Sequence, residues 1–240
     1  MRYGIIADIH SNLEALEAVL EVHDAKGVES YLSTGDLVGY GADPCACIDR
    51  VREIGTVVTA GNHDWAAANR LSLDYFNPYA REAIYWTQER LSPEHFRYLE
   101  ELPLTEKVDD ITLVHGTLYD PENFDYLLTA YDAHLSLQTL TTPLCLVGHS
   151  HVPITFLLDG HVTFSFEPET DLTGVEKAIV NPGSVGQPRD ENPKAACGFY
   201  DSETKMITIE RVPYDIEKAT AKIIRAGLPE VLAERLWLGK

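Results

Sequence analysis

Five short motifs concentrate histidine and acidic side chains, and each follows a segment that we predict to be a strand. They are Asp8-Ile9-His10, Gly35-Asp36, Gly61-Asn62-His63-Asp64, Val114-His115-Gly116 and Gly148-His149-Ser150-His151. Imidazole nitrogen together with carboxylate oxygen suits Mn, Fe, Co, Ni or Zn, and the absence of thiolate disfavours copper(I). Imidazole-rich sets also disfavour Mg and Ca. The residue types therefore predict a site for divalent transition metals.

The spacing within two of these motifs predicts paired ligands. Side chains two apart in an extended segment point to the same side, so Asp8 with His10, and His149 with His151, are each predicted to aim at one point. The ends of the strands of an α/β sheet are also where binding sites form. Taken singly, each motif has an ordinary explanation, such as a turn at a Gly-Asp pair or a helix cap at Asn62 or Asp64. The set of five favours the metal site.

The first sixty residues predict the framework that positions the motifs. Strands are predicted at 3–7, 31–34 and 56–60, and two helices separate them. Ser11 or Asn12 is expected to cap the first helix, and Gly27 to end it. Asp43-Pro44 begins the second helix, and Gly55 ends it. This order favours a mostly parallel sheet with helices packed against it.

The remaining chain continues as one predicted domain, 1–240, with a helical insertion at about 65–102. Helices are expected to start at Asn77-Pro78 and Ser92-Pro93, and a last helix is capped by Asp215. The aromatic residues of the insertion, Tyr75, Phe76 and Trp86 among them, either pack as core or overhang a cleft, where they could stack on a base; packed helices are favoured. Further strands are predicted at 111–114, 144–147, 154–158, 161–166, 178–180, 198–200 and 206–212. Asp159-Gly160 predicts a type I′ hairpin turn.

Composition and charge exclude several classes of protein. The chain has 240 residues, 45% apolar and 24% charged, with a net charge of −19. This balance argues against binding to long nucleic acid or to an anionic membrane. We expect no signal peptide and no membrane span, and so a cytoplasmic location.

The four cysteines are expected to be reduced; they are Cys45, Cys47, Cys145 and Cys197. Cys45 and Cys47 could bind a soft metal. The favoured interpretation is that they are two small residues in the first turn of a helix.

The five motifs, in this order, resemble the calcineurin-like metallophosphoesterase superfamily, from Ile5 to about Arg189. The chain looks closest to the small bacterial and archaeal phosphodiesterases. That narrower resemblance is carried by 8–12 (Asp-Ile-His-Ser-Asn), 35–41 (Gly-Asp-Leu-Val-Gly-Tyr-Gly) and 181–189 (Asn-Pro-Gly-Ser-Val-Gly-Gln-Pro-Arg). It implies an α/β fold, a four-layer α/β/β/α sandwich of two mixed β-sheets flanked by helices.

The resemblance also implies the role of each motif residue. One metal ion would be bound by Asp8, His10, Asp36 and His151, and the other by Asp36, Asn62, His115 and His149. His63 would donate a proton or hydrogen bond to the leaving oxygen, and Asp64 would orient His63. Two such metals could bind a bridging water or hydroxide that attacks phosphorus in line. Their positive charge would let an acidic protein accept a phosphate.

Three more residues are candidates for binding substrate. Arg189 would reach the phosphate, or else pair with Asp190 or Glu191. Asn12 would hydrogen-bond near the metals, or else only cap its helix, and Tyr40 would line the cleft. Many relatives carry an arginine after the fourth motif, where this chain has Thr117-Leu118-Tyr119, and the preferred substrate is left open by that difference.

The sequence therefore predicts a dinuclear-metal hydrolase of phosphate esters, with phosphodiesters favoured. The alternatives are a phosphomonoesterase or protein phosphatase, and a non-catalytic metal sensor or scaffold with the same fold. The partner would be a small phosphorylated molecule such as a nucleotide. The residues that select it are expected in the 65–102 insertion and in the loop after His115.

Overall fold

The computed structural model describes residues 1–240, and two six-stranded sheets form its centre. The strand order of the first sheet is β3-β2-β1-β11-β12-β9. Its strands are β1 (Arg2–Ile6), β2 (Ser30–Ser33), β3 (Val57–Val58), β9 (Glu169–Asp171), β11 (Ala195–Asp201) and β12 (Met206–Val212). The order of the second sheet is β4-β5-β6-β10-β7-β8. Its strands are β4 (Thr105–Val108), β5 (Ile111–Val114), β6 (Leu144–Leu146), β7 (Ile154–Asp159), β8 (His161–Ser165) and β10 (Lys177–Asn181).

Both sheets mix parallel and antiparallel pairs. In the first, β1, β2 and β3 are parallel, as the β-α-β-α-β pattern predicts, and β11 joins β1 in antiparallel register with Phe199 opposite Gly4. In the second, β6 is parallel to β5 and β10, and the other pairs are antiparallel. The parallel strands β1, β2, β5 and β6 are followed at their carboxyl ends by the motif residues.

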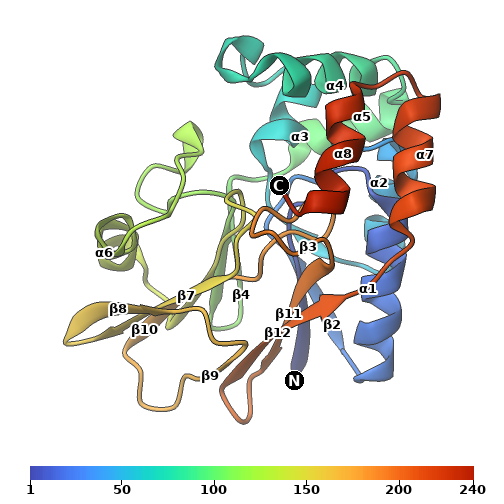
Figure 1. Ribbon diagram of the computed structural model, residues 1–240. Coiled ribbons are helices and arrows are strands. Elements are labelled where there is room, and N and C mark those ends of the chain that lie inside the picture. Colours follow the sequence, from blue (N-terminus) through green and yellow to red (C-terminus); the bar gives the residue numbers. More distant parts are fainter.

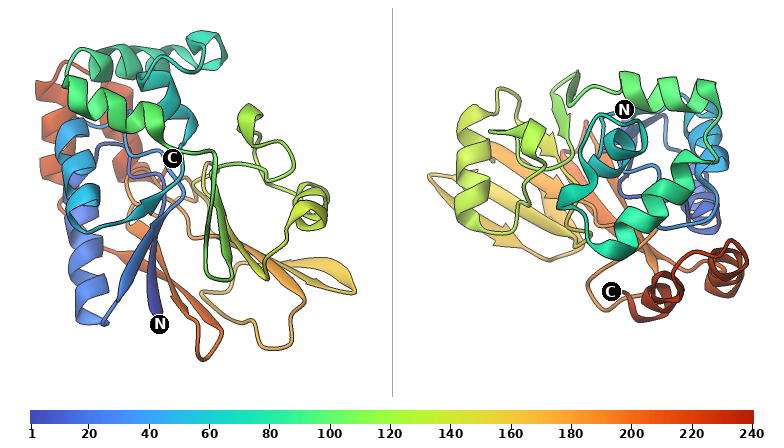
Figure 2. Two further views of the ribbon diagram at one scale, coloured as in Figure 1. Left: turned by 180° about the vertical axis from the view of Figure 1, so that it is seen from behind. Right: turned by 90° about the horizontal axis from the view of Figure 1, so that it is seen from above.

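Helices cover the outer faces of the two sheets. They are α1 (Leu13–Ala25), α2 (Pro44–Glu53), α3 (Asn62–Ala67), α4 (Pro78–Gln88), α5 (Pro93–Glu101), α6 (Ala130–Thr139), α7 (Ile216–Arg225) and α8 (Glu230–Leu238). Two short 3₁₀ helices are η1 (Leu73–Tyr75) and η2 (Pro121–Asn123). Figures 1 and 2 show α1, α2, α7 and α8 gathered on the side of the first sheet, whereas α6 lies alone beside the second.

The buried apolar side chains form three clusters that separate these layers. The largest joins the helices to the outer face of the first sheet and includes Leu16 of α1 and Ile223 of α7. A second lies between the sheets, where Ile5 and Leu113 belong to opposite layers. A third joins α6 to the second sheet through residues such as Leu137. The predicted four-layer arrangement of two mixed sheets flanked by helices is confirmed.

Side-chain caps explain where most helices begin. Asn12, Asn77, Ser92 and Asp215 each accept a hydrogen bond from a backbone amide in the first turn, at the predicted positions. Asp43 occupies the predicted cap position of α2 without such a bond, because its carboxylate pairs with Lys222 at 2.7 Å.

Several elements differ from the prediction. Helices α6 and α8 and strands β4 and β9 were not predicted. The β7–β8 hairpin is present, but the type I′ turn is wrong: Asp159 pairs with His161 around Gly160, and Gly160 alone has positive φ where type I′ needs two such residues. Cys45 and Cys47 lie in the first turn of α2, as the favoured interpretation has it.

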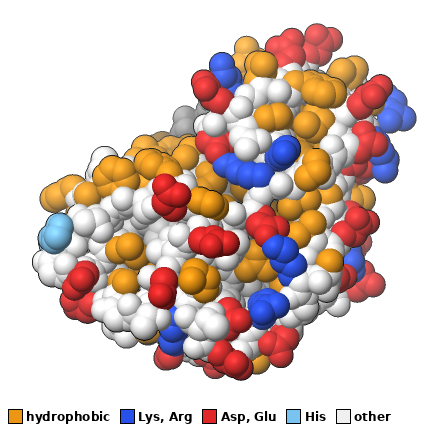
Figure 3. Space-filling model, turned by 60° about the horizontal axis from the view of Figure 1, so that its bottom comes forward, with side chains coloured by type: hydrophobic (Ala, Val, Ile, Leu, Met, Phe, Trp, Pro, Cys, Tyr) orange, Lys and Arg blue, Asp and Glu red, His pale blue; other side chains and the backbone are white.

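The surface agrees with the charge balance. On the face shown in Figure 3, the Lys and Arg side chains are scattered among Asp and Glu and form no stripe. None of the helices has both the length and the apolar character needed to cross a membrane.

Candidate metal centre

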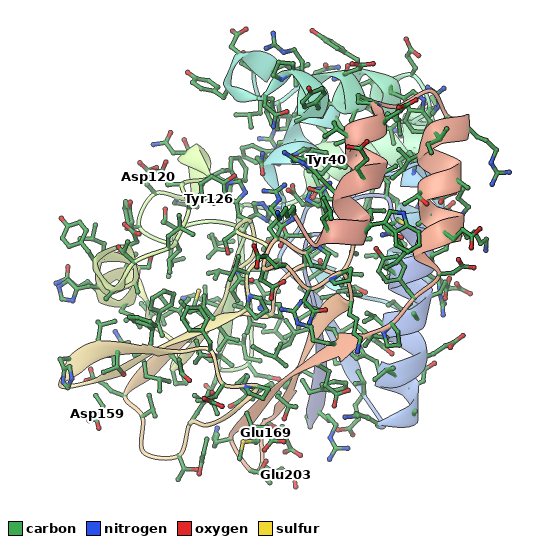
Figure 4. All side chains as sticks on the ribbon, in the orientation of Figure 1. Tyr40, Asp120, Tyr126, Asp159, Glu169 and Glu203 are labelled. Atoms are coloured by element: carbon green, nitrogen blue, oxygen red, sulfur yellow. The ribbon has the colours of Figure 1, made fainter.

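The loops that leave β1, β2 and β3 of the first sheet and β5 and β6 of the second bring all five motifs to one edge of the sandwich. All seven candidate ligands are at or near the start of these loops; they are Asp8, His10, Asp36, Asn62, His115, His149 and His151. Every one of these except Asn62 has at most 8% of its surface exposed. Figure 4 labels Tyr40 and Tyr126 on opposite sides of this region.

The backbone of these loops is left-handed where the sequence suggested that it would be extended. The φ angles of Asp8, His10, Asp36, His149 and His151 are 51°, 48°, 54°, 68° and 60°. Non-glycine residues seldom adopt this conformation, and it collects at functional sites where the surroundings hold it in place. The backbone amides of Asp8 and His10 donate to the carbonyls of Gly35 and Asp36 at 3.0 and 2.9 Å. Asp8 and His10 converge because of these turns, so the extended-segment explanation is wrong. The prediction that His149 and His151 aim at one point is also wrong, because these two side chains turn toward two different sets of donors.

Two glycines of the motifs lie so close to the Asp36 and Asp8 carboxylates that no side chain would fit in their place. A Cβ at Gly61 would lie 2.0 Å from Asp36 Oδ1, and one at Gly148 would lie 2.9 Å from Asp8 Oδ2. A side chain at either position would therefore displace a candidate ligand.

The imidazole rings of His10 and His151 point their Nε2 atoms at each other. The Nδ1 atoms of His10 and His151 donate to the carbonyls of Val38 and Gln187, at 3.0 and 2.5 Å. This tautomer leaves an unprotonated Nε2 on each ring, and the two Nε2 atoms are 3.0 Å apart. Facing lone pairs repel unless a cation or a proton lies between them, so the arrangement fits a shared metal ion.

A second group of donors converges in the same way. His115 Nδ1 donates to the carbonyl of Thr34 at 2.8 Å, so Nε2 is the nitrogen that could bind a metal once it has lost its proton. That Nε2 lies 3.1 Å from His149 Nδ1, 3.2 Å from Asn62 Oδ1 and 3.3 Å from Asp36 Oδ2. Backbone carbonyls that fix the far nitrogen of a ligand histidine are a regular feature of metal sites.

The donors form two groups that share one carboxylate. Asp8, His10, Asp36 and His151 form the first, and Asp36, His115 and His149 form the second, each with its ligand atoms within 4.8 Å of one another. The resemblance implied the same division, with Asn62 added to the second group. The residues present therefore fit two metal ions with Asp36 between them.

The pKa values of these groups show how much the site needs cations. Burial raises the pKa of Asp8 to about 7, in spite of the opposing charge of His115. Burial alone would also raise the pKa of Asp36, but the charge of His115 and its hydrogen bond to Asp36 hold that pKa well below its usual value. Burial favours neutral His115, yet Asp36 raises its pKa to about 9. The site without metal thus retains protons that bound cations would displace.

His63 lies beside the donors but is not one of them. Its ring packs against His10, Tyr40 and Phe76, with centroids 4.8, 4.5 and 5.1 Å away, and it lines the cleft above the centre. Its Nδ1 lies against Gly39 and has no hydrogen-bond partner. Burial lowers the pKa of His63 to about 4, so the ring is neutral near pH 7.

The expected contact between Asp64 and the His63 ring is absent. The Asp64 carboxylate instead accepts hydrogen bonds from four backbone amides, those of Asp36, Leu37, Val38 and Gly61, at 2.8 to 3.2 Å. The physical reason is that Asp64 is the third residue of α3, where a carboxylate turns back to the helix start. Asp64 therefore supports the Asp36 turn and does not orient His63.

Asn12 caps α1 and contacts the loop at Gly186. Its Oδ1 accepts from the backbone amide of Ala15 at 3.2 Å, which caps α1, and its Nδ2 donates to the carbonyl of Gly186 at 2.9 Å. Each end of the amide thus has a backbone partner. The helix cap is confirmed, and substrate binding by Asn12 stays a prediction.

Arg189 and Tyr40 both line the cleft. Arg189 Nη2 donates to Tyr40 Oη at 3.3 Å and to Gln187 Oε1 at 3.0 Å, and its Nε is buried without a partner. Asp190 pairs with Arg211. The alternative in which Asp190 pairs with Arg189 is therefore not what the structure shows.

The cleft has a volume of about 450 Å³, and two segments form its walls. One wall comes from the insertion, through residues including Tyr75, Phe76 and Asn77. The other is the loop after His115, through 122–126. Both segments were expected to select the substrate, but Phe124 and Tyr126 were missed individually. Their signal was only an aromatic pair in that loop, which does not show what the rings contact.

Comparison with known proteins gives a consistent result. A family model described as the calcineurin-like phosphoesterase superfamily domain matches residues 1–205. An uncharacterised protein of Methanocaldococcus jannaschii is 40% identical over 99% of this chain and 98% of its own. The crystal structure of a metallophosphoesterase from Sphaerobacter thermophilus is 43% identical, covers 100% of this chain and 99% of its own, and has a TM-score of 0.90. A hypothetical protein of Pyrococcus horikoshii shares the fold at 22% identity and a TM-score of 0.81, over 100% of this chain and 98% of its own.

Proposed function

Because the chain belongs to the calcineurin-like phosphoesterase superfamily, we propose that it hydrolyses phosphate esters with two divalent metal ions, and that small phosphodiesters are its preferred substrates. The observation that carries the proposal is the pair of facing Nε2 lone pairs of His10 and His151, 3.0 Å apart, beside two buried carboxylates. Two neutral imidazoles in this arrangement repel unless a cation or a proton lies between them, and a scaffold without metal would not require it.

The seven donors would hold the two metals, with Asp36 shared between them. When bound, a pair of such ions lowers the pKa of water, aims it at phosphorus and offsets charge on the phosphate oxygens. Mn, Fe, Co, Ni and Zn all suit the imidazole and carboxylate donors. Left-handed turns position five of these donors, which are Asp8, His10, Asp36, His149 and His151.

His63 is the residue of this chain that would assist the leaving group. Its neutral ring lines the cleft beside His10 without contributing to either donor group. A neutral imidazole carries one N–H, and it can give a hydrogen bond or a proton to the oxygen that departs.

The charge of the cleft favours diesters over monoesters. Arg189 is the single Lys or Arg among the residues that line it, so the protein supplies one positive charge to the phosphate there. A diester carries one negative charge near neutral pH and a monoester carries nearly two, so the diester needs less protein cation. The cleft also extends along two walls, which leaves room for a group on either side of phosphorus.

Metal-stripped protein assayed with bis-p-nitrophenyl phosphate and p-nitrophenyl phosphate tests the proposal. We expect no turnover without metal, and turnover after addition of Mn, Co, Ni or Zn, with the diester preferred. His63→Ala should lower kcat on the diester by about 10²-fold or more, the range of general acid catalysis.

Two controls make the test decisive. His134→Ala, on the exposed side of α6, should match the wild type. Metal content measured in His63→Ala should equal that of the wild type. Binding of two metals without hydrolysis of either ester would favour a sensor, and failure to bind two metals would refute the proposal.

A further inference from the structure

The wall formed by the loop after His115 presents a fixed aromatic ring. Tyr126 stacks on His149 with centroids 4.0 Å apart and planes 17° from parallel. Its neighbours Phe124 and Leu127 are buried, so the loop is anchored on both sides of Tyr126. Tyr126 nevertheless remains 47% exposed and lines the cleft. One face of its ring is covered by the imidazole, and the ring remains accessible from the cleft.

The opposite wall presents a second exposed tyrosine. Tyr75 ends η1, is 87% exposed and lines the same cleft. The next residue, Phe76, is buried and packs edge-on against His63. Packing in the core therefore explains Phe76 but not Tyr75. Each wall thus combines a buried phenylalanine with an exposed tyrosine.

Charge divides the cleft into an inner and an outer part. Arg189 lies on the inner side, within hydrogen-bonding distance of Tyr40. Glu122 and Asp125, both exposed, lie on the loop that carries Tyr126. A phosphate fits the inner part, whereas an added negative charge at the outer part would be repelled.

We propose that this cleft selects esters whose organic group is a flat aromatic ring without negative charge, such as a nucleobase or an aryl group, and that Tyr126 and Tyr75 recognise that ring. The inference rests on the proposed phosphoesterase function for the position of the phosphate. Tyrosine rings stack on bases and other aromatic groups regardless of sequence or detailed shape. The acidic residues of the loop would disfavour substrates with a polyphosphate or acidic peptide beyond the phosphate.

Binding of two matched phosphonates to the Mn²⁺-loaded protein tests the proposal without requiring turnover. Benzylphosphonate and cyclohexylmethylphosphonate have similar size and charge, but only the first has a flat aromatic ring. Their carbon–phosphorus bonds are not hydrolysed, so calorimetry reports affinity alone. We expect the wild type to prefer the benzyl compound about fivefold, within the range that aromatic pairing adds beyond area burial.

The variants separate recognition from support of the metal centre. Tyr126→Leu and Tyr75→Leu should each bring the preference close to one, and Tyr126→Phe should keep it. Tyr85→Leu is the matched control, since Tyr85 is 54% exposed on α4 and does not line the cleft. A change in Tyr126→Leu that weakens both compounds equally would mean that Tyr126 only supports His149, and this would overturn its assignment.

The charge requirement has its own measurement. Benzylphosphonate with a carboxylate at the para position should bind about threefold more weakly, and Glu122→Gln with Asp125→Asn should close the gap. No preference between the first two phosphonates in the wild type, or no binding of either at millimolar concentration, would refute the inference. Ester hydrolysis without aromatic preference would leave the proposed function standing, and aromatic preference without hydrolysis would leave the inference standing.

Discussion

Asp64→Asn should lower the free energy of unfolding of the metal-free protein and weaken its metal binding. Both effects are expected because Asp64 holds the turn that carries Asp36. The two Asp64 oxygens each accept two backbone amides, Oδ2 from Asp36 and Gly61, and Oδ1 from Leu37 and Val38. Asparagine retains one oxygen and turns an NH₂ group toward the other two amides, so two bonds to a charged acceptor are lost.

The magnitude follows from those two bonds. A hydrogen bond to a charged group contributes about 1.5–3 kcal/mol, so the free energy of unfolding should fall by roughly 3–6 kcal/mol. Asp132→Asn offers a matched control, because Asp132 occupies the same position of the capping box of α6 but is only partly buried. Loss of that surface cap should cost only about 1 kcal/mol.

Urea unfolding of the metal-free variants at pH 8 measures these values, and calorimetric titration with Mn²⁺ measures the metal affinity. The pH is chosen because burial raises the pKa of Asp64 to about 7. If Asp64→Asn lowered turnover strongly while the free energy of unfolding and the metal affinity stayed unchanged, Asp64 would act on His63 after all, and the support of the turn would be refuted.

Three further perturbations address the site and the core. Asp36→Asn should reduce the bound metal from two ions to fewer than one, as measured by elemental analysis. Metal at a hundred times its Kd should stabilise the wild type by roughly 2.7 kcal/mol, and this stabilisation should be absent from the variant. Retention of both ions would contradict a shared carboxylate. Arg189→Ala should raise KM for the diester about tenfold or more, the effect of one charged hydrogen bond, while an unchanged kcat/KM would remove Arg189 from the site. Burial lowers the pKa of His23 from 6.5 to about 4, so the unfolded chain binds the extra proton between these values and stability is lost as pH falls below 6.5. The wild type should lose about 2 kcal/mol of its free energy of unfolding between pH 7 and pH 5 through this group. His23→Leu should lack that part of the loss when both proteins are unfolded in urea, and an equal loss in the two proteins would count against the assignment.

The sequence predicted those parts of the fold that local chemistry determines. Asn77-Pro78 and Ser92-Pro93 combine a capping side chain with a proline in the first turn, and both helices begin there. The alternation of apolar strands and amphipathic helices up to residue 60 gave the parallel half of the first sheet. Strand β4, in contrast, is a polar edge strand, Thr105–Val108, whose pairing with β5 has no apolar signature of its own.

For the site, the residue types identified the candidate donors, but the sequence could not give their geometry. Asp8 and His10 converge through left-handed turns held by contacts with the Gly35–Asp36 segment, a long-range interaction that spacing does not reveal. Asn12 and Asp64 were recognised as residues able to cap helices, and they do so. What the sequence could not show is which distant backbone the same side chains contact, the Gly186 carbonyl for Asn12 and the amides of the Asp36 turn for Asp64.

The position of the donors across the two sheets sets the order in which the site can be assembled. Asp8, His10 and Asp36 come from the first sheet, and His115, His149 and His151 from the second. Each donor group contains members from both sheets, so neither is complete in a chain that has formed only one of them. A folding intermediate with a single sheet would bind metal weakly, and the ions would join side chains that lie far apart in the sequence, such as Asp8 and His151. Metal acquisition would thus mark the end of folding, and a chain that failed to pair its sheets would never become active.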